Sequence, residues 1–408
     1  MEAKVQDRVS LKKEDLGGTI TALWVIGVLG LIGAAIGCHL NPKAFNFSWL
    51  FSFMVFYTMA AGSFFWLVVQ HATNSGWNTL VRRQLENVVG VFPYLALFFI
   101  PLLPIVGGDR LHSLWPWLNP AVTAHDPLYH AKAGYFTLGF DWPAFFYLRL
   151  AFYFATFVLV GAWFRRRSLQ QDSDGHPIHS VVMRKTSYGV IALFAISISF
   201  SAIDWMMSMD YRWYSTMWGV YIFAGCAGSA MALLAIILHS LKAKGYLQLV
   251  NEEHFHIVGK LMFAFTIFWS YIAFSQFMLI WYANIPEETI FYKIRNTPEW
   301  FPLSIGMLVG HFIIPFLWLL GQKAKKTPWR LIAGASWMIF IHMCDLYWII
   351  MPVYQKSPIP DWKHFLLNAS CFLGIGCVIA AVFLKNLTKA NLYPVKDPRL
   401  DESIHLKN

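Results

Sequence analysis

The sequence predicts an all-α integral membrane protein, and three observations lead to that class. Hydrophobic residues make up 57% of the 408 positions and charged residues only 13%, whereas soluble domains carry roughly 25% charged residues. Apolar runs recur along the whole chain, and about 20 apolar residues suffice for one helical crossing of a bilayer. The positive charges concentrate in alternate loops, as in multi-pass proteins. We therefore expect a lipid bilayer, and not nucleic acid, to be the partner of this basic chain.

Ten apolar runs are long enough to cross a membrane, and we expect ten transmembrane helices. They lie at residues 18–40, 47–70, 87–106, 143–164, 184–205, 214–240, 255–282, 298–320, 329–351 and 362–387. The N-terminal segment is polar up to Asp15, and the first run is too long for a secretory signal. We therefore expect span 1 to stay in the mature chain.

The distribution of Lys and Arg predicts the orientation. Both tails and every second loop hold most of these residues, and positive loops face the cytoplasm. We expect both termini to be cytoplasmic. The Trp-rich loop at 107–142 should face outward.

A weak internal repeat relates spans 2–5 to spans 6–9. The last span of each quartet carries an acidic residue near its outer end followed by aromatic residues, in SAIDWMMSMD and in HMCDLYWIIMP. Parallel repeats are a known plan of membrane proteins, so each quartet could form a bundle. The similarity is also short enough to arise by chance.

Polar side chains on spans 5 and 9 are candidate functional residues, because an ionisable group at the centre of a membrane helix costs about 2.5 kcal/mol or more. Ser197, Ser201 and Asp204 share one face of span 5. His342 and Asp345 lie three residues apart on span 9, a spacing that places both on one helix face.

Span 7 carries a polar stripe of its own. Lys260, Tyr271 and Ser275 recur at helical spacing, and Gln276 lies beside them. Glu287 follows at the outer end of the span. This stripe would place polar groups in the same outer half of the membrane as those of spans 5 and 9.

If these polar faces converge, they would form a hydrated proton path that opens outward. Its candidate residues are Ser197, Ser201, Asp204, Lys260, Tyr271, Ser275, Gln276, Glu287, His311, His342 and Asp345. The alternative is that the hydroxyl and amide groups only bond neighbouring helices, which is common in membrane proteins.

Arg149 lies in the outer third of span 4 and requires a counter-charge or access to water. Asp141 and Asp204 are the candidate carboxylates. Snorkelling of the side chain to the membrane surface is the alternative.

Neither a metal ion nor haem is expected in this chain. The segment EEHFH at 252–256 contains two histidines, but no cysteine or further carboxylate completes a ligand set, and its position suits a helix start. His311 and His342 should lie roughly 20 Å and 13 Å below the outer ends of their spans, too unequal in depth for one haem. No haem-attachment motif is present.

The segments SFSAIDWMMSMDYRWYSTMWGVYIFAG and FWSYIAFSQFMLIWYANIPEET resemble the second NrfD-like membrane subunit (the ActF family) of bacterial alternative complex III, a quinol:cytochrome c oxidoreductase. The resemblance extends over essentially all ten spans. It implies two four-helix bundles, at residues 47–205 and 206–351. It also implies peripheral spans at 18–46 and 352–387 and cytoplasmic tails at 1–17 and 388–408.

The resemblance further implies partners in the bacterial cytoplasmic membrane: a larger NrfD-like quinol-oxidising subunit, a multihaem cytochrome c, an iron–sulfur subunit and small membrane subunits. Haem c and the clusters would belong to those partners. This chain would be a cofactor-free scaffold, with a proton path or a site for menaquinone or ubiquinone as open alternatives. A secondary transporter and a purely structural anchor are the other functions that the sequence allows.

Overall fold

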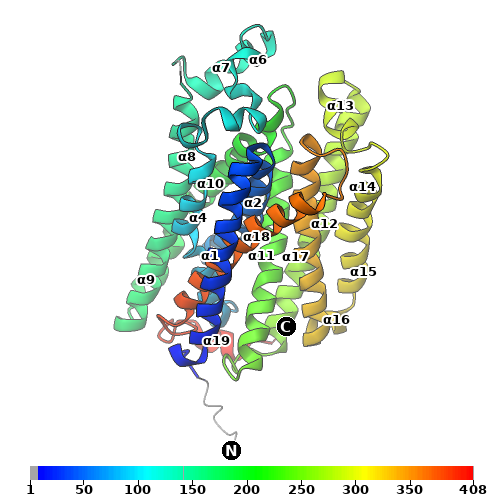
Figure 1. The fold of residues 1–408 in the computed structure, drawn as a ribbon. Coiled ribbons are helices and arrows are strands. Elements are labelled where there is room, and N and C mark those ends of the chain that lie inside the picture. The colour runs from blue at the N-terminus through cyan, green and yellow to red at the C-terminus, as the bar shows by residue number, and fades with distance from the viewer. Residues whose placement is uncertain (1–7, 141, 408) are drawn as a thin grey trace, which may run out of the picture.

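The computed structural model describes residues 8–140 and 142–407, and in this part of the chain the regular structure is helical (Figure 1). Nine of the described helices are long and apolar enough to cross a membrane, which confirms the all-α membrane class. They comprise α1 (Gly17–Leu40), α2 (Pro42–Ala72), α8–α9 (Ala144–Asp174), α10 (Ile178–Trp205), α11 (Trp218–Ala243), α12 (Glu252–Ala283), α14–α15 (Phe301–Leu320), α17 (Pro328–Ile350) and α18 (Trp362–Leu387).

The expected span at 87–106 is not a single continuous helix. The segment divides into α3 (Thr79–Val89), α4 (Phe92–Phe98) and a 3₁₀ turn at Ile100–Leu102. Proline lacks the N–H group that a helix interior requires and fits only the first helical turn. Pro93 and Pro101 therefore begin new turns, and the apolar run is interrupted.

Two of the helices form the centre of the molecule. Helix α2 contacts α3 and α10 in one direction and α11 and α17 in the other, and α11 also contacts α12. In the most apolar stretches of α2 and α11, 83% and 78% of the residues are buried inside the protein. We call α2, α3–α4, α8–α9 and α10 the first helix group, and α11, α12, α14–α15 and α17 the second helix group; α2 and α11 pack against each other and join the two.

Helices α1 and α18 pack against each other beside α2 (Figure 1). Their backbones come very close at one point: a Cβ atom on Gly30 would lie 2.6 Å from the backbone nitrogen of Gly374. Small residues permit such close helix contacts in membranes, where packing must replace the hydrophobic drive that water supplies. In the most apolar stretch of α1 only 11% of the residues are buried, so α1 is the most peripheral of these helices.

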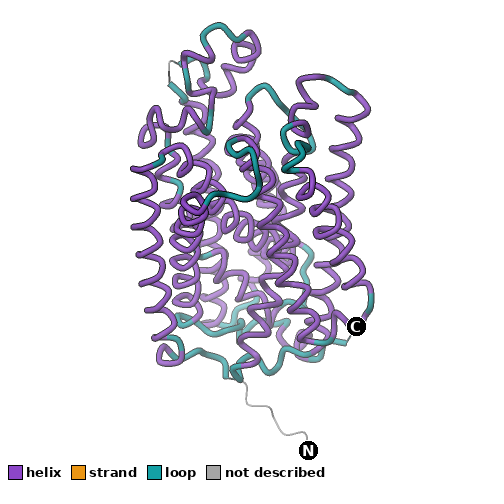
Figure 2. Tube along the Cα trace, turned by 45° about the vertical axis from the view of Figure 1, so that its right-hand side comes forward, coloured by secondary structure: helices purple, strands orange, loops and turns teal. Residues whose placement is uncertain are grey.

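The two ends of the molecule are built differently. The upper end in Figure 1 carries α6 (Pro120–Thr123), α7 (Pro127–Thr137) and α13 (Pro286–Lys293). The loop at 107–142 is folded there, with Trp117 buried and Trp142 54% exposed. Both described chain ends lie at the lower end (Figure 2), where the backbone N–H of Leu392 donates to the carbonyl of Val9. Residues 1–7 and 408 of the expected tails lie outside the described residues.

Candidate functional site

Three ionisable side chains meet inside the second helix group. His342 and Asp345 lie on α17, and His311 lies on a π-helical turn, Leu308–Ile313, between α14 and α15. One ligand-type atom of each side chain lies within 4.8 Å of those of the other two. The three residues are only 6%, 3% and 2% exposed for His311, His342 and Asp345. We call them the His–His–Asp cluster.

The structure corrects the expected depths of the two histidines. The indole N–H of Trp348 on α17 donates to Oγ of Ser304 on α14 at 2.8 Å, so these two residues are level. His311 follows Ser304 by seven positions and His342 precedes Trp348 by six, and the helices run in opposite directions. At 1.5 Å per residue, both residues lie about 9–11 Å below that contact, which agrees with the closeness of their side chains.

Hydrogen bonds to neighbouring helices fix the orientation of His342. Its Nε2 lies 2.9 Å from Oγ1 of Thr58 on α2. Oγ1 of Thr58 also lies 2.8 and 3.1 Å from the backbone carbonyls of Met54 and Val55. With the hydroxyl proton donated there, this oxygen accepts the Nε2–H of the imidazole. In the neutral ring Nδ1 then carries the lone pair, and Nδ1 is buried without a hydrogen-bond partner.

Asp345 and His311 are held by aromatic neighbours. The phenol of Tyr221 on α11 donates to Oδ1 of Asp345 at 2.5 Å. The ring of Trp269 on α12 stacks on His311 with a centroid distance of 3.7 Å. Nε2 of His311 is buried and has no hydrogen-bond partner. No salt bridge joins Asp345 to a cation within residues 8–140 and 142–407.

Glycine makes room for the cluster. A Cβ atom at position 225 on α11 would lie 2.8 Å from Cε1 and 2.9 Å from Nδ1 of His342, closer than carbon atoms pack. Any other residue at position 225 would place its Cβ atom too close to the imidazole ring in this orientation.

A second buried carboxylate, Asp204 on α10, belongs to the first helix group. Arg149 on α8 donates to both of its oxygens at 2.7 and 2.8 Å. Tyr135 and Tyr153 donate to them at 2.9 and 2.7 Å. The expected pairing of Arg149 with Asp204 is therefore confirmed; the alternative partner, Asp141, lies outside the described residues.

The other polar residues of span 5 do not reach the His–His–Asp cluster. The hydroxyl groups of Ser201 and Tyr57 are 2.9 Å apart, within the first helix group. Oγ of Ser197 is buried without a hydrogen-bond partner. Span 5 thus forms a polar site of its own around Asp204.

The expected polar stripe of span 7 does not point into the protein. Tyr271 is 63% exposed, Lys260 and Glu287 are also exposed, and Ser275 is half-buried. Helix α12 instead buries the neighbouring face, where the amide of Gln276 accepts a hydrogen bond from Ser215 at 3.0 Å. Helical spacing shows which residues share a face, but packing decides which face turns inward.

The segment EEHFH begins α12, as the sequence suggested. The side chain of Asn251 accepts the backbone N–H groups of Glu253 and His254, and the His254 ring bonds back to the Asn251 N–H. This reciprocal arrangement is a capping box. The segment therefore serves as a helix cap.

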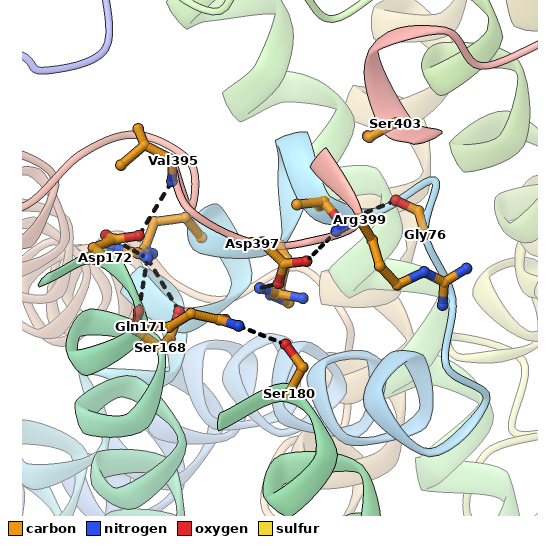
Figure 3. A network of polar contacts seen from close by, with 12 residues as sticks. Gly76, Ser168, Gln171, Asp172, Ser180, Val395, Asp397, Arg399 and Ser403 are labelled. Atoms are coloured by element: carbon orange, nitrogen blue, oxygen red, sulfur yellow. Dashed lines mark hydrogen bonds and ion pairs between the residues drawn. The ribbon is translucent and has the colours of Figure 1, made fainter. Parts of the chain in front are cut away.

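Sequence reasoning missed a buried ionic network at the lower end (Figure 3). Arg82 on α3 pairs with Asp397 of the C-terminal segment at 2.7 Å, and Arg83 pairs with Asp172 on α9 at 2.9 Å. Glu86 lies 3.0 Å from Arg83. The only available signal was the pair of arginines next to an apolar run, and their partners lie about 90 and 315 positions away in sequence.

Comparison with known proteins adds no assignment: neither a family model nor a curated protein sequence matches the chain. Function must therefore be argued from the residues. The candidate residues divide into a fully paired carboxylate in the first helix group, the unpaired His–His–Asp cluster in the second, and a surface stripe on α12. Among the described residues, the His–His–Asp cluster is the one group of three or more buried His, Cys, Asp or Glu side chains whose ligand atoms, one from each, all lie within 4.8 Å of one another.

Proposed function

We propose that this chain is an integral membrane subunit of a quinol:cytochrome c oxidoreductase of the alternative complex III type, and that the His–His–Asp cluster carries protons. The observation that supports it best is Asp345, which is 2% exposed and has two histidines within 4.8 Å. A carboxylate in the membrane interior that forms no salt bridge is costly unless it exchanges a proton or an ion; the nearby Arg295 donates its hydrogen bonds to backbone carbonyls instead.

The chemistry of the cluster suits proton transfer. Imidazole and carboxyl groups are the side chains most often used as proton donors and acceptors. The free lone pair on Nδ1 of His342 can accept a proton, and the Tyr221 hydroxyl extends the chain of groups from Asp345 onto α11. Quinol oxidation releases protons that such a relay could pass on.

We further propose the membrane arrangement that the resemblance implies. The two helix groups would be two four-helix bundles, with α3–α4 as the third crossing and α1 and α18 as peripheral spans. The lower end, where both described chain ends lie, would face the cytoplasm of a bacterium. The concentration of Lys and Arg in the tails and alternate loops supports this orientation.

Electron transfer would belong to partner subunits in this proposal. A larger NrfD-like subunit would oxidise menaquinol or ubiquinol, and an iron–sulfur subunit and a multihaem cytochrome c would take the electrons. The upper end, with its folded α6–α7 cap and α13, would face the periplasmic partners. The support for this assignment is the resemblance of the two quoted segments.

A secondary transporter is a second candidate, and one observation favours it. Corresponding helices of the two groups both contain a π-helical turn, Thr156–Val160 and Leu308–Ile313. Such turns often occur at functional sites, and matched helix irregularities are typical of transporter repeats. Neither helix is unwound, however, so the proton relay is the simpler function.

The proposal can be tested in the purified complex, reconstituted in sealed vesicles that contain a pH-sensitive dye. The assay measures quinol turnover with a soluble electron acceptor, together with the change in internal pH. For Asp345→Asn we expect proton movement or turnover to fall by about tenfold or more, because positioned acid–base groups commonly contribute about 10²–10⁴.

Ser201→Ala is the matched control, since Ser201 precedes Asp204 by three positions as His342 precedes Asp345. It should retain full turnover. An intact Asp345→Asn complex with unchanged turnover and pH change would reject the relay and favour a purely structural anchor. Proton movement driven by a solute gradient without quinol would instead establish a transporter.

A further inference from the structure

The His–His–Asp cluster contains buried polar atoms that the protein leaves unused. Nε2 of His311 and Nδ1 of His342 are both buried and have no hydrogen-bond partner. Leaving such an atom unsatisfied costs about 1–3 kcal/mol. One ring nitrogen of each histidine and one carboxylate oxygen of Asp345 lie within 4.8 Å of one another. A single ligand atom or ion placed among the three side chains could contact both imidazole rings and the carboxylate.

The protonation of His342 indicates what that atom must be. With the Thr58 hydroxyl proton donated to a carbonyl of its own helix, Thr58 accepts the Nε2–H, and Nδ1 offers a lone pair to the cluster. The carboxylate of Asp345 also offers lone pairs. Two electron-pair donors side by side attract a cation, and no cationic side chain among the described residues is bonded to Asp345.

The donor set is one that transition metals use. Two imidazole nitrogens and one carboxylate oxygen bind Zn²⁺ and Fe²⁺ in many proteins, with open positions for water. Metal-binding histidines nearly always donate their other N–H to a neighbouring group, as His342 does to Thr58. Tyr221 and Trp269 hold Asp345 and His311 in the same supporting manner.

We propose that His311, His342 and Asp345 bind one divalent first-row transition-metal ion, with Zn²⁺ as the representative ion. Metal–ligand distances of about 2.0–2.2 Å require the donor atoms to be closer together than the 4.8 Å limit of the cluster. Small rotations of the three side chains bring them into range. This is a property of the cluster itself and stands apart from any role in a respiratory complex.

One consequence does rest on the proposed function. A bound metal ion would occupy the lone pair of His342 and the carboxylate of Asp345, the same groups that would accept protons. The metal and the transferred proton would compete for the cluster. Bound Zn²⁺ should then inhibit proton movement in the vesicle assay.

Metal binding can be measured without any activity. The full chain is purified in detergent from cells grown with added Zn²⁺, treated with a chelator to remove surface ions, and analysed for metal by mass spectrometry. We expect about one ion per chain. Metal-free protein titrated with Co²⁺ should develop the visible absorption bands of a protein-bound cobalt ion.

Four variants test the site. His342→Asn and Asp345→Asn remove a ligand and should lower metal occupancy at least tenfold. Thr58→Val leaves all three ligands in place but removes the acceptor of the His342 N–H, and such changes typically weaken metal binding about 10–100-fold. Gly225→Ala keeps every polar group and crowds the His342 ring, so it should weaken binding as well.

His71→Asn is the matched control. His71 on α2 is also a buried histidine with an unpartnered Nε2, but it belongs to no group of metal-ligand side chains in the described part of the chain. It should keep the full metal content. If the wild type takes up neither Zn²⁺ nor Co²⁺, or if His342→Asn and Gly225→Ala both elute as folded protein with full metal content, the proposal is wrong, and a water molecule bridges these atoms instead.

Discussion

Each helix group carries one buried aspartate near the upper end of its last long helix, Asp204 on α10 and Asp345 on α17. Both accept hydrogen bonds from tyrosine. Asp204 is also bonded by both arms of the Arg149 guanidinium. Asp345 has two histidines beside it and no salt bridge among the described residues. The two aspartates thus differ in their pairing: Asp204 is bonded directly to an arginine, whereas Arg295 interacts with Asp345 without a salt bridge between them.

The difference indicates which site is built for stability and which for exchange. A buried carboxylate bonded by guanidinium has its charge neutralised within the protein. The carboxylate of Asp345 needs a proton or an ion to neutralise it. The first site therefore joins α8 to α10, whereas the second is the site at which we propose that a proton or an ion exchanges.

The largest expected effect separates the two aspartates by stability. Asp204→Asn leaves the Arg149 charge buried without a partner, and breaking a buried pair in this way costs about 3–5 kcal/mol. Asp345→Asn breaks no salt bridge among the described residues. The buried Arg295, whose charge interacts with Asp345, keeps its hydrogen bonds to the carbonyls of Phe291 and Trp348, so we expect a smaller loss. Thermal or denaturant unfolding of both variants in the same detergent measures the difference.

The double substitution Arg149→Met with Asp204→Leu is the control for that experiment, because it removes both charges together. It should recover much of the lost stability. Equal destabilisation by the two single aspartate variants would break the comparison, since it would mean that Asp345 also compensates a buried cation.

The tyrosines give an effect of intermediate size. Tyr221→Phe removes a hydrogen bond to a carboxylate, and bonds to charged groups contribute about 1.5–3 kcal/mol. Tyr57→Phe removes only a hydroxyl–hydroxyl bond to Ser201, which contributes about 0.5–1.5 kcal/mol. We expect the first variant to unfold at the lower denaturant concentration; the reverse order would show that Asp345 carries a proton when the chain is at rest.

The smallest expected effect is the pH dependence of helix α7, which lies over the Asp204 site. Helix α7 carries Tyr135, and Asp126 caps its first turn by accepting the Leu128 N–H. The hydrogen bond from Tyr211, with further contributions from Leu128 and Arg212, holds the pKa of Asp126 below its usual value. A lowered pKa means that the stabilisation is present above the unfolded value of about 3.9 and is lost as the pH falls through the folded value.

Hydrogen exchange of α7 should therefore be unchanged between pH 7 and pH 5, after correction for intrinsic rates, and should rise below about pH 4. Asp126→Asn should show the faster exchange at neutral pH already. The α17 segment around Asp345 serves as the internal control, since Asp126 does not contact it. Exchange in α7 that is independent of pH would remove Asp126 from this role.

The amino-acid sequence alone predicted the class and most of the helices. The run at 362–387 coincides with α18, and the run at 329–351 is shifted by a single residue from α17. Hydropathy suffices here because a membrane helix must satisfy its own backbone and expose apolar side chains, and both properties are local. Pro93 also indicated a helix break in the sequence, but the length of the apolar run around it favoured a continuous span.

The sequence also predicted that Arg149 pairs with Asp204 and that His342 and Asp345 share one helix face, because charge in an apolar run is conspicuous and helical spacing relates near neighbours. It did not place His311 beside His342, turn Gln276 rather than Tyr271 inward, or join Arg82 to Asp397. These relations depend on the register and rotation of helices that are far apart in sequence. Side-chain packing and hydrogen bonds such as Trp348 to Ser304 set that register, so only the tertiary structure could decide them.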